Sequence, residues 1–358
     1  MSFSIKSVLS VFAVLVSVLS FSNTITVQNI NDEGAGSLRQ AVRDAVNGDV
    51  IRFNESLIAS GNAIIELDSS IVYSLKGLTF KGLYNNTDTL KISGNNTNRI
   101  FTISNVTVPT VLDSLVLIDG MATGGGPASY GGAVLFVTCS GVIHINNCVI
   151  YNNSADHSGG AIGFDNSIGT SELTIFNCLI NNNTSLARGG GVFFDCFSSQ
   201  GTLNIEESVI QGNNVTDPTG NGGGVYAGSS NVGVDLTVSV KNSEIIENSV
   251  LYDAGGLIAV SYGGDVDLTI ENSTVEGNTA TFGAGLYARS NALGKTVTAI
   301  INNSTINNNV ATSNGGGVLV TSTQSNGVVD LSINNSTFFE NETSLSGGYG
   351  GAIFSGWS

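Results

Sequence analysis

Apolar residues at alternate positions recur through most of the chain, in a unit that also places small polar residues at fixed spacings. In one unit, Ile143 and Ile145 precede Cys148, another apolar residue follows at Ile150, and Asn153 stands three positions later. Apolar residues two apart are typical of strands with one face turned inward. Each unit therefore predicts a strand, a sharp turn at the Cys or Ser, a short strand and a turn at the Asn.

A Gly-rich tetrapeptide marks the second half of each unit, and its copies begin 28 to 35 residues apart. Glycine pairs suit places where a Cβ would hinder the backbone. The large apolar residue that closes the tetrapeptide predicts a further inward-facing strand. The copies begin at Gly131, Gly159, Gly189, Gly222, Ala254, Gly283, Gly315 and Gly350.

A period of about 31 residues built from short strands predicts an all-β solenoid, a right-handed parallel β-helix in which each unit forms one coil. Ankyrin and TPR repeats have a similar period but need helices, and no helical periodicity is present in these units. A propeller blade needs four strands and a longer period. We expect regular coils over 131–358 and less regular first coils, with an N-terminal cap, over 23–130.

One polar residue holds the same place in seven successive units. Because neighbouring coils stack at about 4.8 Å, these side chains would form a ladder inside the solenoid, with each amide bonded to the next. The Cys or Ser of each unit would form a second, smaller ladder. The ladder residues are Asn153, Asn183, Asn213, Asn248, Asn278, Asn309 and Asn341, and Cys148, Cys178, Ser208, Ser243, Ser273, Ser304 and Ser336.

Residues 1–22 have the features of a secretory signal peptide. Lys6 supplies a positive charge, Val8–Leu19 is apolar, and small residues precede a cleavage site after Ser22. An apolar stretch of this length is short for a membrane-spanning helix. We therefore expect a secreted or cell-surface protein, without stable membrane insertion of this chain.

The chain contains one convincing amphipathic helix, at 37–46. Ser37 is suited to cap its first turn, Gln40 would complete a capping box, and Gly48 would end it. Leu38 and Val42 lie on one face. Since the open end of a solenoid exposes its core, we expect this short helix to cover the N-terminal end.

The segments Thr26–Val42, Gly48–Phe53, Leu90–Asn95 and Arg99–Ile103 resemble the N-terminal region of secreted right-handed parallel β-helix proteins. The Gly-Gly-Ala-Ile and Asn repeats resemble those of polymorphic outer-membrane protein adhesins. This resemblance implies export and the pectin lyase-like β-helix fold. That fold hosts adhesins as well as polysaccharide lyases and hydrolases, so the resemblance leaves the function open.

The charge balance disfavours polyanionic partners, unless a bound cation bridges them to the chain. The chain has 28 acidic and 12 basic residues and a formal net charge of −16, so a basic stripe for nucleic acid is not expected. After residue 130 the basic residues Arg188, Lys241, Arg289 and Lys295 occupy unrelated positions in the repeat. We therefore assign no catalytic residues, and the His and Cys spacings predict no metal site and no cofactor.

Three small groups of side chains are candidates for further roles. Tyr226 and Tyr287 follow inward residues at matched positions two coils apart, where an outward ring could stack on a sugar or simply shield the strand. Asp265 and Asp267 could hold a weakly bound cation or be ordinary surface carboxylates. Cys148 and Cys178 should be stacked neighbours, which we expect to remain unbridged because parallel side chains align poorly with the torsion of a disulfide.

Two functions fit these features. The first is an exported, non-enzymatic β-helix that acts as a cell-surface adhesin or extracellular scaffold and binds a surface or matrix macromolecule or glycan. The second is a carbohydrate-active β-helix, either a polysaccharide lyase or hydrolase or a glycan-binding module. The repeats also run to the last residues without a capping segment. This predicts that the end is completed by further repeats of a longer product, by a partner or by a second copy end to end, unless Trp357 and the last loop fold over it.

Overall fold

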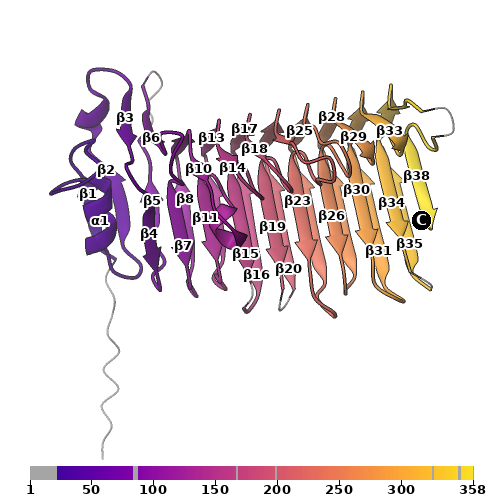
Figure 1. Ribbon diagram of the computed structural model, residues 1–358, viewed down its shortest axis with the longest axis horizontal. Coiled ribbons are helices and arrows are strands. Elements are labelled where there is room, and N and C mark those ends of the chain that lie inside the picture. Colours follow the sequence, from indigo (N-terminus) through magenta and orange to yellow (C-terminus); the bar gives the residue numbers. More distant parts are fainter. Residues whose placement is uncertain are drawn as a thin grey trace, which may run out of the picture.

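The computed structural model describes residues 22–83, 88–166, 168–197, 200–324, 326–345 and 348–357. Within these residues the chain winds as a parallel β-helix, with its coils stacked along the long axis of the molecule (Figure 1). All strand pairs are parallel. The predicted signal peptide, residues 1–22, lies outside the described residues except for its last position.

Three long sheets, which we call A, B and C, form the faces of the solenoid. Sheet A contains β1 (Thr24–Val27), β2 (Val50–Phe53), β5 (Thr79–Lys81), β8 (Thr110–Asp113), β12 (Ile143–Asn146), β16 (Ser171–Phe176), β20 (Gly201–Glu206), β24 (Leu236–Lys241), β27 (Val266–Glu271), β31 (Thr296–Asn302) and β35 (Val328–Asn334). Sheet B contains β3 (Ala63–Glu66), β6 (Leu90–Ser93), β9 (Val116–Ile118), β13 (Val149–Tyr151), β17 (Leu179–Asn181), β21 (Val209–Gln211), β25 (Glu244–Ile246), β28 (Thr274–Glu276), β32 (Thr305–Asn307) and β36 (Thr337–Phe339). Sheet C contains β4 (Ile71–Ser74), β7 (Phe101–Ser104), β11 (Val134–Val137), β15 (Ile162–Asn166), β19 (Val192–Cys196), β23 (Val225–Ser229), β26 (Leu257–Ser261), β30 (Leu286–Ser290), β34 (Val318–Ser322) and β38 (Ile353–Trp357).

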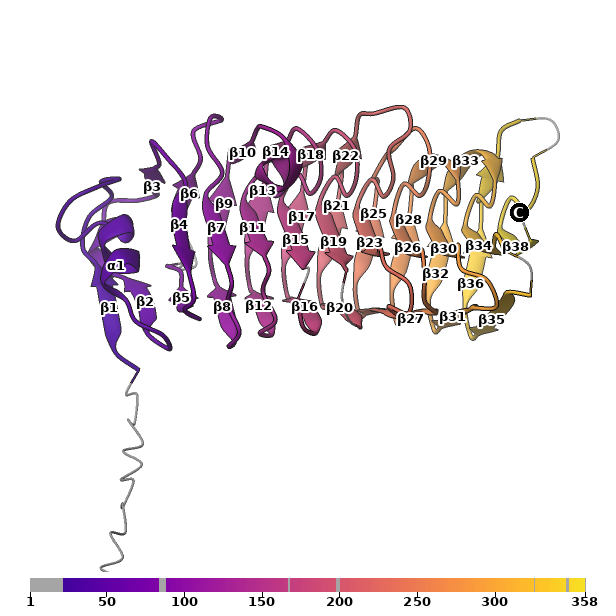
Figure 2. The ribbon, with the colours of Figure 1, turned by 60° about the horizontal axis from the view of Figure 1, so that its bottom comes forward.

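Shorter strands join sheet B to sheet C and form two small sheets along one edge of the solenoid (Figure 2). One consists of β10 (Met121–Ala122), β14 (Ser154–Ala155), β18 (Thr184–Ser185) and β22 (Asn214–Val215). The other consists of β29 (Thr279–Phe282), β33 (Val310–Asn314) and β37 (Glu342–Thr343). The helical segments are α1 (Leu38–Asp44) and the 3₁₀ turns η1 (Glu55–Ile58) and η2 (Gly126–Ser129).

Inward residues of each strand stack on their equivalents in the next coil. Ile143 and Ile145 of β12 pair with Leu173 and Ile175 of β16, and all four are fully buried. Beneath sheet C, three phenylalanine rings follow one another along the axis with centroids 6.1 and 5.0 Å apart. These rings belong to Phe136, Phe164 and Phe194. The parallel β-helix predicted from the repeat is therefore confirmed.

The corner before each ladder residue is made by a single residue in the left-handed region. The corner residues have φ between 47° and 65°, where Asn and Gly are tolerated best. Their side chains point outward while those of the next residues point inward. The corner residues are Asn147, Asn177, Glu207, Asn242, Asn272, Asn303 and Asn335 before the Cys/Ser ladder, and Asn152, Asn182, Gly212, Glu247, Gly277, Asn308 and Glu340 before the Asn ladder.

The Asn residues form a continuous buried ladder. The backbone N–H and the Nδ2 of Asn183 both donate to Oδ1 of Asn213, each at 3.0 Å, and the same pattern repeats from Asn153 to Asn341. Each Nδ2 also reaches a carbonyl of the preceding coil, such as Ile150 O at 3.0 Å from Asn183. Every amide therefore finds partners above and below, apart from the half-buried Asn341 in the last coil.

The Cys/Ser ladder follows the same rule. The N–H of Cys148 donates to Sγ of Cys178 at 3.3 Å, and the N–H of Cys178 donates to Oγ of Ser208 at 3.0 Å. Later steps use Ser hydroxyls at 3.1 Å. Cys148 and Cys178 are buried, and each is a free thiol that donates to carbonyl oxygens of its own corner and the preceding coil.

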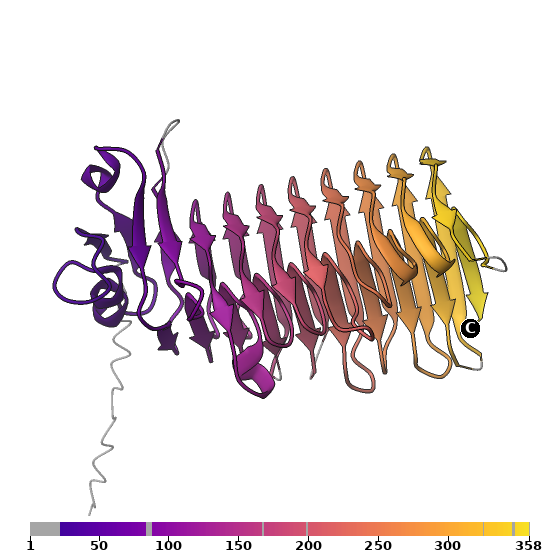
Figure 3. The same ribbon diagram turned by 45° about the horizontal axis from the view of Figure 1, so that its top comes forward.

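Helix α1 lies at the N-terminal end, opposite the last strand of the chain (Figure 3). Leu38 and Val42 join the solenoid core, so the helix covers this end as predicted. Ser37 caps it through the N–H of Gln40, but the Gln40 side chain bonds to Asp44 and does not complete a capping box. The helix ends at Asp44, earlier than expected, with Ala45 as its C-cap. The ammonium of Lys76 donates hydrogen bonds there to the carbonyl oxygens of Val42 and Ala45.

Candidate functional site

The outer face of sheet C carries the largest set of aromatic and ionised side chains on the repeat. Three columns of side chains run along this face, and each is defined by its distance from the left-handed residue that begins each Gly motif. The first column lies one residue before that residue, the second lies four residues after it, and the third lies six residues after it. The first column contains Tyr130, Ser158, Arg188, Asn221, Asp253, Phe282, Asn314 and Tyr349. The second contains Leu135, Gly163, Phe193, Tyr226, Ile258, Tyr287, Leu319 and Phe354. The third contains Val137, Asp165, Asp195, Gly228, Val260, Arg289, Thr321 and Gly356.

The middle column forms an apolar layer outside the solenoid core. Phe193, Tyr226, Ile258 and Leu319 are buried in a cluster that is separate from the residues inside the coils. The rings of Phe193 and Tyr226 stack at 5.5 Å with 19° between their planes. The partly buried rings of Tyr130, Phe282 and Phe354 pack against this layer.

The N-terminal half of this face combines an arginine with a buried acid. The guanidinium of Arg188 lies over the Tyr226 ring, 5.1 Å from its centroid. Asp195 is buried and accepts hydrogen bonds from the hydroxyl of Ser230 at 2.9 and 3.0 Å. Burial raises the pKa of Asp195 to about 7, with a further rise from Asp165 on the adjacent strand and an opposing effect of Ser230 and Arg188.

The C-terminal half contains a cavity of about 370 Å³. Arg289 Nη1 lies 3.3 Å from the carboxylate of the buried Asp253, and its guanidinium covers the ring of Tyr287 at 5.2 Å. Burial raises the pKa of Asp253 to about 6, while Arg289 opposes that rise. Aromatic side chains from three coils surround the pair: Tyr252, Phe282, Tyr349 and Phe354.

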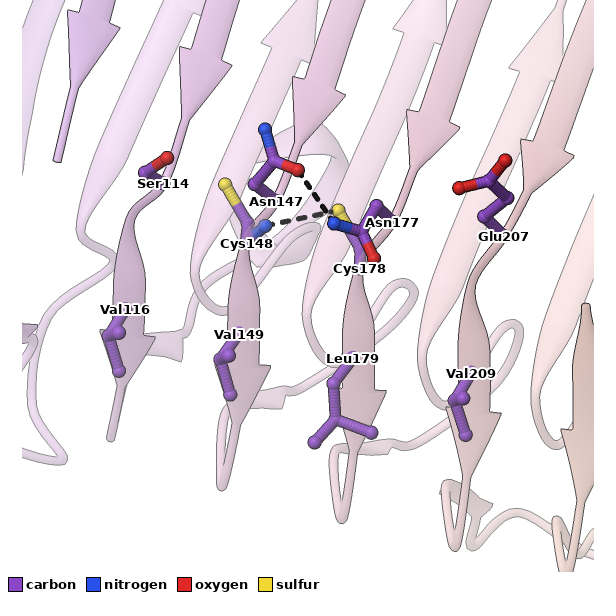
Figure 4. A pocket seen from close by; sticks show the side chains of 10 residues that line it. All are labelled: Ser114, Val116, Asn147, Cys148, Val149, Asn177, Cys178, Leu179, Glu207 and Val209. Carbon is purple, nitrogen blue, oxygen red and sulfur yellow. Dashed lines mark hydrogen bonds between the residues drawn. The ribbon is translucent and has the colours of Figure 1, made fainter. Parts of the chain in front are cut away.

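A second groove of about 510 Å³ follows the corner between sheets A and B (Figure 4). Its apolar floor consists of Val116, Val149, Leu179 and Val209, one from each of four coils. The corner residues above them form an outer ladder, in which Nδ2 of Asn177 donates to Oδ1 of Asn147 at 2.7 Å (Figure 4). This groove offers contact surface and hydrogen bonds, with Glu207 as its ionised side chain.

The prediction that the rings of Tyr226 and Tyr287 point outward and stack on a sugar is wrong. Tyr226 is 1% exposed and Tyr287 is 5% exposed, because the middle column of sheet C is covered by loops and by the two arginines. Both rings act as shields of the strand, the other role considered for them. Tyr287 still lines the cavity, where its hydroxyl lies 3.2 Å from that of Thr321.

The predicted cation site at Asp265 is occupied by a lysine. Nζ of Lys295 lies 3.5 Å from Asp265 and 3.7 Å from Asp235, and the N–H of Thr296 donates to Asp265 at 2.7 Å. Asp267 points outward from β27, in register with Thr237 and Thr298. Asp265 and Asp267 therefore do not form a pair, and the described residues contain no cluster of three or more metal-ligating side chains.

The basic residues occupy different repeat positions as expected, since Arg188 lies in the first column and Arg289 in the third. The sequence pattern placed Arg289 in a variable loop, which is wrong: it lies in β30 and shares the outer face of sheet C with Arg188. Both arginines lie beside a tyrosine ring and near a buried carboxylate. The columns become visible in the sequence only when each unit is aligned on its left-handed residue.

One family model matches the chain. The Chlamydia polymorphic membrane protein repeat matches residues 147–165, which run from the corner before Cys148 through the ladder Asn153 and the Gly motif into β15. The chain is a parallel β-helix protein with repeats of this kind. No curated protein and no solved structure matches it. Among the described residues, no helix is long and apolar enough to cross a membrane.

Proposed function

We propose that this protein is an exported, surface-associated β-helix adhesin or scaffold, and that it recognises a macromolecule through the outer face of sheet C. The observation that carries the proposal is the set of arginine, buried carboxylate and aromatic side chains gathered along that one face. Side chains on stacked strands are held rigidly, which favours recognition of a large partner without ordering costs.

Two further observations support this function. The matched repeat is named for a polymorphic membrane protein of Chlamydia, which favours a membrane-associated or surface role, and the same strand pairing extends over the regular coils of this chain. The strongly acidic composition also favours partners that are not polyanions. A cell-surface or matrix macromolecule meets these conditions.

The test is adhesion of beads coated with residues 23–358 to cultured animal cells and to immobilised matrix glycoproteins. Two exposed leucines, Leu186 and Leu251, each stand two residues before the first column of the face. We expect Leu186→Glu combined with Leu251→Glu to reduce adhesion at least tenfold, because it adds charge at the rim of the face.

Leu293→Glu provides the matched control, since Leu293 is equally exposed but lies in the turn between sheets C and A. It should adhere like the unmodified protein. Adhesion no stronger than that of albumin-coated beads, or equal adhesion of all three proteins, would rule out recognition through this face. Thermal unfolding of each variant verifies that the solenoid is intact.

A further inference from the structure

The cavity at the C-terminal half of the sheet C face has aromatic walls and a polar floor. Tyr252 is 43% exposed and meets Phe282 edge-on, with ring centroids 5.5 Å apart. On the other side Tyr349 is 65% exposed and lies 6.2 Å from Phe354. Between these walls lie the carboxylate of Asp253 and the guanidinium of Arg289.

The ion pair on the floor keeps hydrogen-bonding capacity for a ligand. Asp253 and Arg289 contact each other through one Nη1–Oδ2 pair of 3.3 Å. Nε of Arg289 is buried and has no hydrogen-bond partner among the described residues. A buried donor without a partner destabilises the site, and a ligand hydroxyl that accepts from this guanidinium would supply the missing partner. Vicinal hydroxyl groups can accept from a guanidinium and donate to a carboxylate at the same time.

We propose that this cavity binds a neutral oligosaccharide, with sugar rings packed on Tyr252 and Tyr349 and hydroxyl groups bonded to Asp253 and Arg289. The proposal rests on the proposed function and names the chemistry that the face recognises. Pockets of about 300–1,000 Å³ with apolar walls and few convergent polar groups are typical of small-ligand sites, and this cavity falls within that range.

The charges on the floor select against ions. A cationic ligand, such as a quaternary ammonium group, would suit the aromatic walls but would be repelled by Arg289. An anionic ligand would meet Asp253 and a chain of net charge −16. A neutral ligand with many hydroxyl groups avoids both penalties and uses both partners.

The cavity also has the length of more than one sugar ring. Its first-column members Asp253, Phe282, Asn314 and Tyr349 come from four successive coils. Three steps of about 4.8 Å give a line of about 14 Å parallel to the solenoid axis. We therefore expect a disaccharide or trisaccharide unit to bind better than a monosaccharide.

The experiment uses residues 23–358 on an array of neutral, sulfated and uronic-acid oligosaccharides, followed by calorimetry on the neutral glucose-, galactose-, mannose- and N-acetylglucosamine-containing di- and trisaccharides. Tyr252→Ala and Tyr349→Ala should each weaken binding at least tenfold. Both side chains are exposed, so the fold should survive. Asp253→Asn, which removes the charge but keeps the shape, should weaken binding several-fold.

Tyr151→Ala is the control, because Tyr151 points outward from β13 on sheet B, away from the cavity. It should bind like the unmodified protein. Absence of binding to every neutral sugar at millimolar concentration would overturn the inference, as would binding only to charged sugars or equal binding by all variants. If beads still adhere in that case, the proposed function stands and the ligand class is wrong. If sugars bind but beads do not adhere, the site stands and the adhesin function fails.

Discussion

At the scale of single residues, the interior tolerates the Asn side chains of the ladder because each of them forms hydrogen bonds with both neighbouring coils. Asn248 accepts from the N–H and the Nδ2 of Asn213, and its own Nδ2 donates to Oδ1 of Asn278 and to Ile210 O at 2.9 Å. A buried amide in this position satisfies backbone groups that the corner would otherwise leave without partners. The ladder is thus part of the corner and not a polar defect in the core.

Replacing one ladder residue should therefore destabilise the fold. We expect Asn248→Leu to lower the free energy of unfolding by about 1–3 kcal/mol, because the N–H of Asn213 and the carbonyl of Ile210 lose buried partners. Urea unfolding followed by circular dichroism measures the change. Asn242→Gly is the control: Asn242 is exposed at a corner with φ 50°, and glycine accepts that geometry. Equal stability of the two variants would contradict the role of the ladder.

The thiol ladder gives a second prediction. Cys148 and Cys178 each donate to carbonyl groups and sit where later coils use serine, so a bridge would remove bonds that the corners use. We expect both thiols to stay free after expression in an oxidising compartment. Mass spectrometry of a non-reduced digest should show unlinked peptides that contain these residues. A linked 148–178 peptide would show the expectation to be wrong.

Buried carboxylates should make stability depend on pH. Because burial raises the pKa of Asp195 to about 7, the folded protein holds more protons than the unfolded chain between about pH 4 and 7. The contribution of Asp195 to stability therefore falls as the pH rises through this window. We expect Asp195→Asn to raise the free energy of unfolding above that of the unmodified protein by about 1–3 kcal/mol at pH 8 and by little at pH 4. Thermal unfolding at both pH values measures the difference. Asp267→Asn, a surface exchange of the same type, is the control. A gain of equal size at both pH values would contradict this origin.

At the scale of strands and corners, the sequence predicts the inward positions, because stacking makes them recur in every coil. It does not predict the contacts between outward side chains, which differ from coil to coil. The Asn ladder and the inward pairs such as Ile143 and Ile145 recur with fixed spacing because each coil must match the next. Outward positions carry no such constraint, so one column contains Arg188, Asp253 and Phe282. The ion pair between Asp253 and Arg289 joins residues of two different columns in adjacent coils. The residue spacing within one unit therefore does not predict it.

The corners themselves were only partly predicted. Most left-handed residues before a ladder position appear in the sequence as Asn-Cys, Asn-Ser, Asn-Asn or Gly-Asn pairs, which a search for αL-tolerant residues would have found. Glutamate also occurs at these corners, as Glu207 before the Cys/Ser ladder and as Glu247 and Glu340 before the Asn ladder, and this weakens the signal because glutamate has no preference for this geometry. Contact with adjacent coils, rather than local preference, decides the conformation there.

The Gly motif predicts strong steric limits at particular positions. A Cβ on Gly223 would lie 2.5 Å from the carbonyl oxygens of both Gly255 and Ser249 in the next coil. We expect Gly223→Ala to cost about 3 kcal/mol or more, because backbone atoms of the next coil would have to move. At Gly125 a Cβ meets nothing within 4 Å, so Gly125→Ala is the control and should be close to neutral. Thermal unfolding compares them, and similar melting temperatures would exclude close packing of coils at Gly223.

At the scale of the whole molecule, the two ends of the solenoid differ. Helix α1 and the residues Leu38 and Val42 cover the first coils. In the last coil, the core residues Val329, Leu331, Ile333 and Phe338 are only partly buried, whereas their equivalents one coil earlier are almost completely buried. Strands β35, β36 and β38 are also the terminal members of their sheets, with one backbone edge unpaired among the described residues (Figure 2).

An end with exposed core residues and free strand edges favours pairing with another chain. We therefore expect the 358-residue chain, after removal of residues 1–22, to self-associate in a concentration-dependent way through its last coil. Size-exclusion chromatography with light scattering measures the mass. Phe338→Lys should shift the protein toward monomer, because it places a charge on the inward side of the edge strand. Phe339→Lys changes the next residue of β36, which points outward and is 44% exposed, and should leave association unchanged. A monomer at all concentrations that binds no hydrophobic dye would contradict the prediction, and equal association of both variants would place the contact elsewhere than the last coil.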